Sequence, residues 1–223
     1  MIDFAAVRRM MVDGQVRTSD VTDPRIIAAM FELPRERFVP ETSADLAYLD
    51  LDAPATRASG AEAVRRLLKP MVLAKLVQAA AVKADDHVLD VGGATGYSSA
   101  LLGRLARSVV ALEEDPALAR LASDNLKAVD ASNVAVVTGR LTEGWLPKAP
   151  YDVIFVNGAA EIVPDALRRQ LKDGGRLVVV VGRAPPRRAM LYRSVGGDVS
   201  GWPIFDAAAP LLPGFAAPPA FVF

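Results

Sequence analysis

The chain has 223 residues, of which 52% are hydrophobic, and its 26 Lys and Arg are balanced by 26 Asp and Glu. This length suits one large domain, or one domain with an added lobe, and the apolar content is ample for a core. The balanced charge gives no general attraction to nucleic acid or acidic membranes, and no apolar run is long enough to span a bilayer. We therefore expect no nucleic-acid or membrane partner.

Two further absences narrow the chemistry. The chain has no cysteine, which excludes disulfides, thiol nucleophiles and Cys-ligated zinc. His87 is the only histidine, so a Ser-His-Asp triad could be built only around it, and we expect it simply to open a strand.

The N-terminus has no basic segment followed by an apolar one, so no signal peptide is predicted. A soluble, cytoplasmic protein is the expectation.

The front of the chain has a helical pattern. Apolar residues recur at helical spacing over residues 2–18, and Asp23-Pro24 predicts the start of a second helix that ends at Pro34. An extended segment is expected at residues 46–50 and an irregular loop at 51–69. The expected division is therefore an N-terminal helical section with a substrate loop over residues 1–69, and a main domain over 70–223.

From residue 84 onward, aliphatic runs alternate with helical patterns, which indicates a parallel sheet with right-handed crossovers. A helix is expected from Pro164 to Gly174-Gly175, and Gly196-Gly197-Asp198 predicts a hairpin turn. The proline-rich, apolar tail from residue 207 is expected to pack on the domain. The predicted class is α/β, with a mostly parallel sheet, a C-terminal antiparallel hairpin and an N-terminal helical section. The predicted strands cover residues 88–91, 108–112, 134–138, 151–156, 176–181, 190–195 and 199–205.

The strand that ends at Asp90 is followed by a glycine-rich turn and the start of a helix. Glycine lets the backbone approach a ligand closely, with the N–H groups of the helix start facing it. Asp90 would repel a pyrophosphate but attract the cationic amino-acid end of S-adenosylmethionine (AdoMet), and the glycine spacing does not match that of a dinucleotide site. The sequence thus predicts an AdoMet site; the alternative is a turn with no ligand. The residues expected there are Asp90, Gly92, Gly93, Ala94, Gly96 and Tyr97.

Three more strand ends face the same edge of a parallel sheet. Glu113 is placed to accept hydrogen bonds from both ribose hydroxyls, because a carboxylate offers two oxygens; the alternative is an acid favoured by the dipole of the next helix. We expect Gly139, Arg140 and Leu141 to border the adenine, and Asn157 and Gly158 to line the cleft near the sulfonium. Ala94 replaces a common glycine, and alanine tolerates the turn only where φ stays negative.

The loop expected at residues 51–69 is locally basic, because it contains Arg65, Arg66 and Lys69. These cations either lie in a solvated loop or face a substrate and bind its carboxylate.

Several short motifs recur in order along residues 10–182. The front section contributes Gln15-Val16-Arg17 and Pro34-Arg35-Glu36-Arg37-Phe38-Val39-Pro40, and the main domain contributes Leu89-Asp90-Val91-Gly92, Pro150-Tyr151-Asp152 and Gly174-Gly175-Arg176. Together these motifs resemble those of protein-L-isoaspartate O-methyltransferases. The resemblance implies a Rossmann-like, AdoMet-dependent methyltransferase fold, of which a hairpin closing the sheet is typical. It implies methyl transfer from AdoMet to the α-carboxylate of isoaspartyl residues in damaged proteins. Such a carboxylate is already ionised at neutral pH and needs no general base.

The chain departs from this family at two places. The family's Gln-Thr-Ile-Ser-Gln-Pro segment is Arg65-Arg66-Leu67-Leu68-Lys69-Pro70 here, so Leu68 stands at the active-site serine. The family's Gly-Asp-Gly is Gly139-Arg140-Leu141, so the acid near the adenine amine is missing. Ser59 lies upstream and could replace the lost hydroxyl. The sequence identifies no catalytic residue, and two alternatives stay open: a different carboxylate acceptor, or a relative that binds AdoMet or a protein without turnover.

Overall fold

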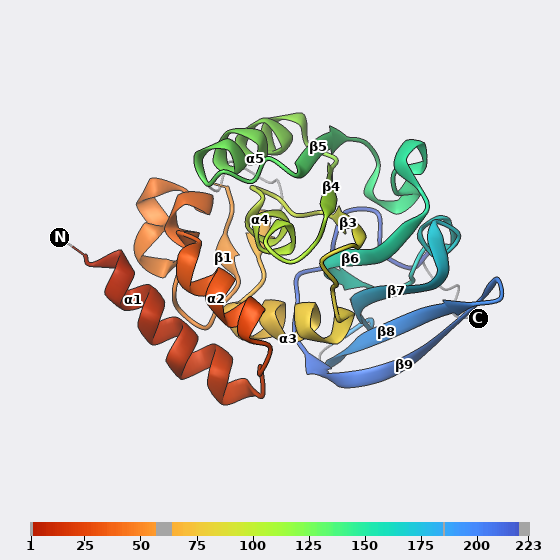
Figure 1. Ribbon diagram of the computed structural model, residues 1–223, viewed down its shortest axis with the longest axis horizontal. Coiled ribbons are helices and arrows are strands. Elements are labelled where there is room, and N and C mark those ends of the chain that lie inside the picture. Colours follow the sequence, from red (N-terminus) through yellow and green to blue (C-terminus); the bar gives the residue numbers. More distant parts are fainter. Residues whose placement is uncertain (1, 57–63, 185, 219–223) are drawn as a thin grey trace.

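The computed structural model describes residues 2–56, 64–184 and 186–218, and a seven-stranded sheet crosses this part of the chain in the order β5-β4-β3-β6-β7-β8-β9 (Figure 1). The first five strands in this order are parallel; β8 runs antiparallel to β7, and β9 runs antiparallel to β8. The predicted sheet and C-terminal hairpin are confirmed. The strands are β3 (His87–Val91), β4 (Ser108–Glu113), β5 (Val134–Thr138), β6 (Tyr151–Ala160), β7 (Leu171–Val181), β8 (Arg187–Val195) and β9 (Asp198–Ala207).

Side chains alternate between the two faces of this sheet, so each face builds its own core. Val88 and Val153 pack with the front section and three helices, whereas Leu89 and Ile154 pack with a short helix and the tail. The strands β3, β6 and β7 are thus buried on both faces, as their aliphatic runs predict. The helices are α1 (Phe4–Met11), α2 (Pro24–Glu32), α3 (Pro70–Ala80), α4 (Tyr97–Gly103), α5 (Pro116–Ala128) and α6 (Asp165–Arg168).

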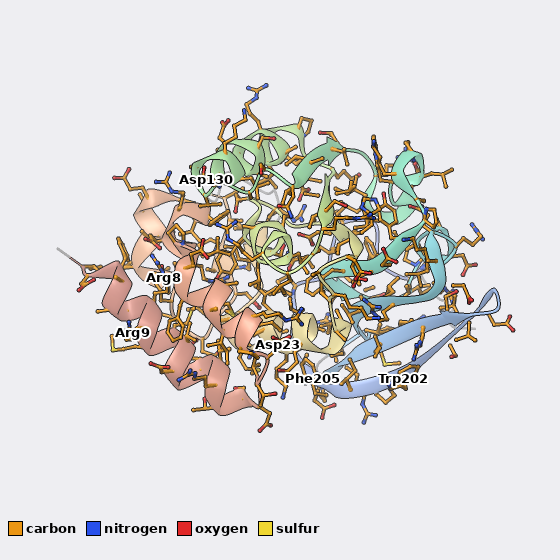
Figure 2. All side chains as sticks on the ribbon, in the orientation of Figure 1. Arg8, Arg9, Asp23, Asp130, Trp202 and Phe205 are labelled. Atoms are coloured by element: carbon orange, nitrogen blue, oxygen red, sulfur yellow. The ribbon has the colours of Figure 1, made fainter. Side chains whose placement is uncertain are left out.

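The helical front section lies beside the sheet, at the left of Figure 1. Asp23 caps α2 by accepting a hydrogen bond from the Arg25 N–H, and Pro24 opens the helix, as predicted. The helix expected over residues 2–18 is instead α1 followed by a π-helical turn at Val12–Val16 and a 3₁₀ turn at Arg17–Ser19. Arg8, labelled in Figure 2, donates hydrogen bonds to carbonyl oxygens at the end of α2 and so fixes α1 against it.

Two local expectations were wrong. Residues 46–50 are not extended: a 3₁₀ helix (Glu41–Leu46) ends there and a turn follows, because the Tyr48 ring is buried and its hydroxyl donates to Glu36. Gly174-Gly175 does not end a helix, since α6 stops at Arg168 and both glycines lie inside β7. The loop expected at 51–69 contains a short antiparallel pair, β1 (Ala53–Pro54) with β2 (Arg66–Leu67).

The described part of the tail returns from β9 to the middle of the sheet, as the violet trace in Figure 1 shows. Leu211 bridges Ala159 in parallel, and Phe215 is buried. The predicted packing of the tail is therefore confirmed for residues up to 218. The strand β6 continues to Ala160, beyond the predicted end at residue 156, because Ala159 and Ala160 pair with β7 after a register shift and the tail pairs with Ala159 from the other side.

The strand β9 forms one margin of the sheet. Trp202 and Ile204 are exposed there, whereas the Phe205 ring lies under the Lys75 ammonium at 4.7 Å (Figure 2). Pro203 lies opposite Met190, next to a register shift between Ala189 and Met190 that leaves Ile204 without a partner in the register.

Within the described ranges, no helix combines the length and the apolar character that crossing a membrane requires.

Candidate active site

Asp90 is the last residue but one of β3 and is fully buried near the centre of the sheet. Its Oδ2 accepts hydrogen bonds of 2.6 Å from the hydroxyls of Ser98 and Ser99, which the first turn of α4 brings over the strand end. Its Oδ1 has no hydrogen-bond partner among the described residues. Burial raises the pKa of Asp90 to about 6, although the two hydroxyls oppose the shift. An acid with a free oxygen therefore stands where the sequence predicts one.

The turn after β3 depends on left-handed backbone conformations. Gly92 has a φ of 76° and Gly96 a φ of 97°. Ala94 has a φ of 52°, so the expectation that alanine would keep a negative φ was wrong. Its N–H donates a 3.0 Å hydrogen bond to Oε2 of Glu113, which holds the turn in this conformation. The two strand ends are thereby tied together.

Gly93 and Tyr97 complete this motif in different ways. A methyl group on Gly93 would lie 2.7 Å from Oδ2 of Asp90, so only glycine fits over the acid. The Tyr97 ring is buried against Phe38, with centroids 5.4 Å apart, and lies 4.7 Å from the Arg35 guanidinium carbon. Tyr97 thus packs in the core between the front section and α4.

Glu113 ends β4, the strand next to β3, and its side chain is only 3% exposed. Besides the Ala94 N–H, its carboxylate accepts backbone N–H groups from Glu114 at 2.8 Å and Asp115 at 3.3 Å. Arg65 completes the shell with a two-pronged contact: Nη1 to Oε1 at 2.7 Å and Nη2 to Oε2 at 3.1 Å. The carboxylate expected to meet a ribose therefore binds a guanidinium of the same chain.

The open side of the turn is covered by two side chains. A methyl group on Gly92 would lie 3.1 Å from Leu212 and 3.3 Å from Nη2 of Arg65, and that nitrogen also donates to the Gly92 carbonyl oxygen at 3.0 Å. Gly158 is equally close to the tail, since a methyl group there would lie 2.6 Å from Cγ of Leu212. The structure thus brings Asp90, Glu113 and the glycine turn together, and places Arg65 and Leu212 on top of them.

Asn157 joins the acidic end of this site. Its amide nitrogen donates to the Ser98 hydroxyl, which in turn donates to Asp90, and its Oδ1 has no partner among the described residues. The sequence prediction that Asn157 and Gly158 lie at the same sheet edge as Asp90 agrees with this geometry.

The segment after β5 is arranged less simply. Leu141 is buried, and Arg140 is largely exposed and paired with Glu143 at 3.5 Å. Gly139 and Arg140 line a cavity of about 420 Å³ that Trp145 also borders. The contact of these residues with an adenine stays a prediction.

The other predicted substrate residues do not converge. Arg66 is exposed and donates to the Asp52 carbonyl oxygen, and the Lys69 N–H donates to the Asp52 carboxylate. The Leu68 side chain is 1% exposed and belongs to the main core. Ser59 lies outside the described residues. Of the basic residues 65, 66 and 69, Arg65 alone touches the predicted cofactor residues in the described part of the chain.

Sequence reasoning missed two residues that shape the site. Leu212 closes it from the tail, whose apolar character predicted packing but gave no location. Arg35 is fully buried and donates to the carbonyl oxygens of Ala47 and Leu68, both at 2.7 Å. Arg35 is a charged residue between Pro34 and Pro40, and nothing in the sequence pattern there predicts its burial.

Comparison with known proteins gives a consistent answer. The family model described as protein-L-isoaspartate(D-aspartate) O-methyltransferase matches residues 7–200. A protein-L-isoaspartate O-methyltransferase 1 of Rhodopseudomonas palustris is 37% identical over 198 residues, which cover 88% of this chain and 78% of the relative. A protein-L-isoaspartate O-methyltransferase of Methanoregula boonei is 40% identical over 175 residues, which cover 78% of each chain.

Solved structures extend the comparison to the fold. A protein-L-isoaspartate O-methyltransferase superposes with a TM-score of 0.80 at 26% identity, covering 93% of this chain and 66% of that one. A Plasmodium falciparum protein solved with S-adenosyl-L-homocysteine has a TM-score of 0.74 at 16% identity, covering 95% of this chain and 99% of the other. The fold is thus the Rossmann-like fold of AdoMet-dependent methyltransferases. With the family match and these relatives, the chain belongs to the protein-L-isoaspartate(D-aspartate) O-methyltransferase family.

Proposed function

We propose that this protein transfers a methyl group from AdoMet to a carboxylate, and that its acceptor is the α-carboxylate of L-isoaspartyl residues in damaged proteins. The observation that carries the proposal is the placement of two buried acids at the carboxyl ends of adjacent parallel strands. Asp90 is the last residue but one of β3, Glu113 ends β4, and the Ala94 N–H of the glycine turn after β3 donates to Glu113. The family to which the chain belongs takes its name from this reaction.

The chemical character of the site fits AdoMet. The free Oδ1 of Asp90 suits the cationic amino-acid end, and the Glu113 carboxylate suits a pair of ribose hydroxyls. The neighbouring Asn157 offers a second buried acceptor, its unpartnered Oδ1. Full occupancy of this site requires that the Arg65 guanidinium leave Glu113.

The proposed chemistry asks little of the protein beyond binding and orientation. When bound, AdoMet supplies the electrophilic methyl group. An acceptor carboxylate, with an ordinary pKa of about 3.5–4, carries its charge at neutral pH without a base. The chain's own contribution is then to align the acceptor and to exclude water, which the buried strand ends and the apolar Leu212 favour.

The test is methyl transfer from labelled AdoMet to a peptide containing one L-isoaspartyl residue, with the ordinary aspartyl peptide as control. We expect a base-labile methyl ester on the isoaspartyl peptide alone. Glu113→Gln removes the charge that holds the nucleoside and is expected to weaken cofactor binding at least about tenfold. Lack of any ester on the isoaspartyl peptide at saturating AdoMet would refute the proposed acceptor.

A second acceptor is favoured by one observation. The family serine position is held by Leu68, whose side chain lies in the core and offers no hydrogen bond. A different carboxylate could then be the natural acceptor of the same methyl group. Esterification of other carboxylate peptides, together with an inert isoaspartyl peptide, would identify this case. In either case, a cytoplasmic location stays a prediction.

A further inference from the structure

The contact between Arg65 and Glu113 saturates the carboxylate. A carboxylate presents about four lone-pair sites. Here it accepts from two guanidinium nitrogens and three backbone N–H groups, the longest of these contacts being 3.3 Å. No acceptor capacity is left for a pair of hydroxyls while the guanidinium stays in place. The side chains are 14% and 3% exposed, so the pair is also shielded from solvent.

The guanidinium also covers the glycine turn. Its Nη2 donates to the Gly92 carbonyl oxygen at 3.0 Å, so one nitrogen spans both strand ends that the cofactor is expected to use. Leu212 lies on the same glycine, within 3.2 Å of where a methyl group would stand. Arg65 and Leu212 therefore occupy the space beside Gly92 in which a ligand could approach the backbone closely.

The two residues are held in different ways. Leu212 is anchored by its backbone: its N–H donates to the Ala159 carbonyl oxygen at 3.0 Å, and the Ala159 N–H donates to that of Pro210 at 2.7 Å. Arg65 reaches the site only with its side chain, from a position just before β2. Withdrawing the guanidinium involves rotation about side-chain bonds of Arg65, whereas moving Leu212 requires separating the tail from β6. Arg65 is thus the exchangeable part of the cover.

We propose that Arg65 is an internal competitor for the nucleoside site, so that Glu113 alternates between the guanidinium and the ribose hydroxyls. The inference rests on the proposed function, because it assigns regulation to that same site. Cofactor binding then includes the loss of the Arg65–Glu113 pair. The apparent affinity is the intrinsic affinity multiplied by the fraction of molecules in the open form, in which this pair is broken. An uncharged residue at position 65 removes the competitor.

The experiment is calorimetric titration with S-adenosyl-L-homocysteine, which binds without turnover. Arg65→Gln is compared with the wild type and with Arg66→Gln, a matched control because Arg66 is exposed and contacts the Asp52 carbonyl oxygen instead. If about nine molecules in ten are closed, Arg65→Gln tightens binding about tenfold, and Arg66→Gln leaves it within about twofold. Arg65→Met, which keeps most of the aliphatic stem, is the second variant should Arg65→Gln fold poorly.

The outcomes separate the two proposals. If the wild type binds S-adenosyl-L-homocysteine and Arg65→Gln binds it equally well or more weakly, the competition is overturned and the methyltransferase proposal stands. Binding by Arg65→Gln together with weak or undetectable binding by the wild type supports the competition, whatever the acceptor is. No binding by any folded variant overturns both, since a protein without the competing Arg65 guanidinium must bind the nucleoside if the proposed function holds.

Discussion

The Nη2 of Arg35 donates a hydrogen bond of 2.7 Å to the carbonyl oxygen of Leu68, 33 residues further along the chain. Its Nε makes a second bond, also 2.7 Å, to Ala47, and the guanidinium lies over the Tyr97 ring. The side chain is completely buried, and burial lowers its pKa. Arg35 therefore pins the front section to the segment that carries Arg65.

Replacing Arg35 with Met is expected to destabilise the protein by about 3–5 kcal/mol, because two buried carbonyl oxygens lose their donors. The free energy of unfolding in urea measures the effect. Arg37→Met is the matched control: Arg37 is exposed, and the expected change is within about 0.5 kcal/mol. Equal losses in both variants would contradict the role given to Arg35.

Placing the family serine at position 68 is not expected to raise the rate of methyl transfer. Leu68 is buried in the core, so Leu68→Ser replaces apolar contacts with an unpaired hydroxyl and should cost about 2–4 kcal/mol of stability. The rate of methyl transfer to an isoaspartyl peptide, per folded molecule, should not increase. A gain of tenfold or more would show that this side chain faces the acceptor after all.

The buried acid gives the protein a characteristic pH dependence. The pKa of Asp90 is raised to about 6 by burial, above its value of 3.8 in an unfolded chain. Below pH 4 both states are protonated, and between pH 4 and 6 the unfolded state loses its proton first, so stability falls as pH rises through this window. Two pKa units correspond to about 3 kcal/mol.

The measurement is urea unfolding of the wild type and Asp90→Asn between pH 4 and 7. The amide oxygen still accepts from Ser98 and Ser99 but carries no charge, so the wild type should lose about 3 kcal/mol relative to the variant across this range. Asp124→Asn, at an exposed position on α5, is the matched control for the same substitution away from the site. A constant difference between the wild type and Asp90→Asn would mean that Asp90 does not titrate there.

The contact between Gly158 and Leu212 predicts a non-additive pair. A methyl group at position 158 would lie 2.6 Å from Cγ of Leu212 and 3.0 Å from the Pro210 carbonyl oxygen, so Gly158→Ala should destabilise by about 1–3 kcal/mol. Adding Leu212→Ala should recover at least about 1 kcal/mol of this loss relative to additivity. Gly14→Ala, which has open space around it, should not destabilise. Strict additivity would place the tail elsewhere.

Much of the sheet could be predicted because its signals are local. Strands with both faces buried are continuous aliphatic runs, and Asp23-Pro24 marks a helix start by capping chemistry alone. The positions of Asp90 and Glu113 follow from the same logic, since parallel strands place their carboxyl ends at one edge.

The contacts that close the site could not be predicted because they join distant segments. Arg65 and Glu113 are 48 residues apart, and no periodic pattern distinguishes Arg65 from Arg66. The positive φ of Ala94 was missed because the Glu113 carboxylate that holds its N–H lies on the next strand. The end of β6 was placed too early because Ala159 pairs with β7 only after a register shift and with a tail residue that comes 52 residues later.

The outer margin of the sheet has one further consequence. A strand with free backbone groups and apolar side chains such as Trp202 and Ile204 is a template onto which another polypeptide can add. Pro203 removes one donor from β9, and the adjoining irregularity in register bends the ribbon, so an incoming strand finds no continuous ladder to extend. The protein can thus expose Trp202 and Ile204 at this margin with a built-in resistance to fibre-like self-assembly.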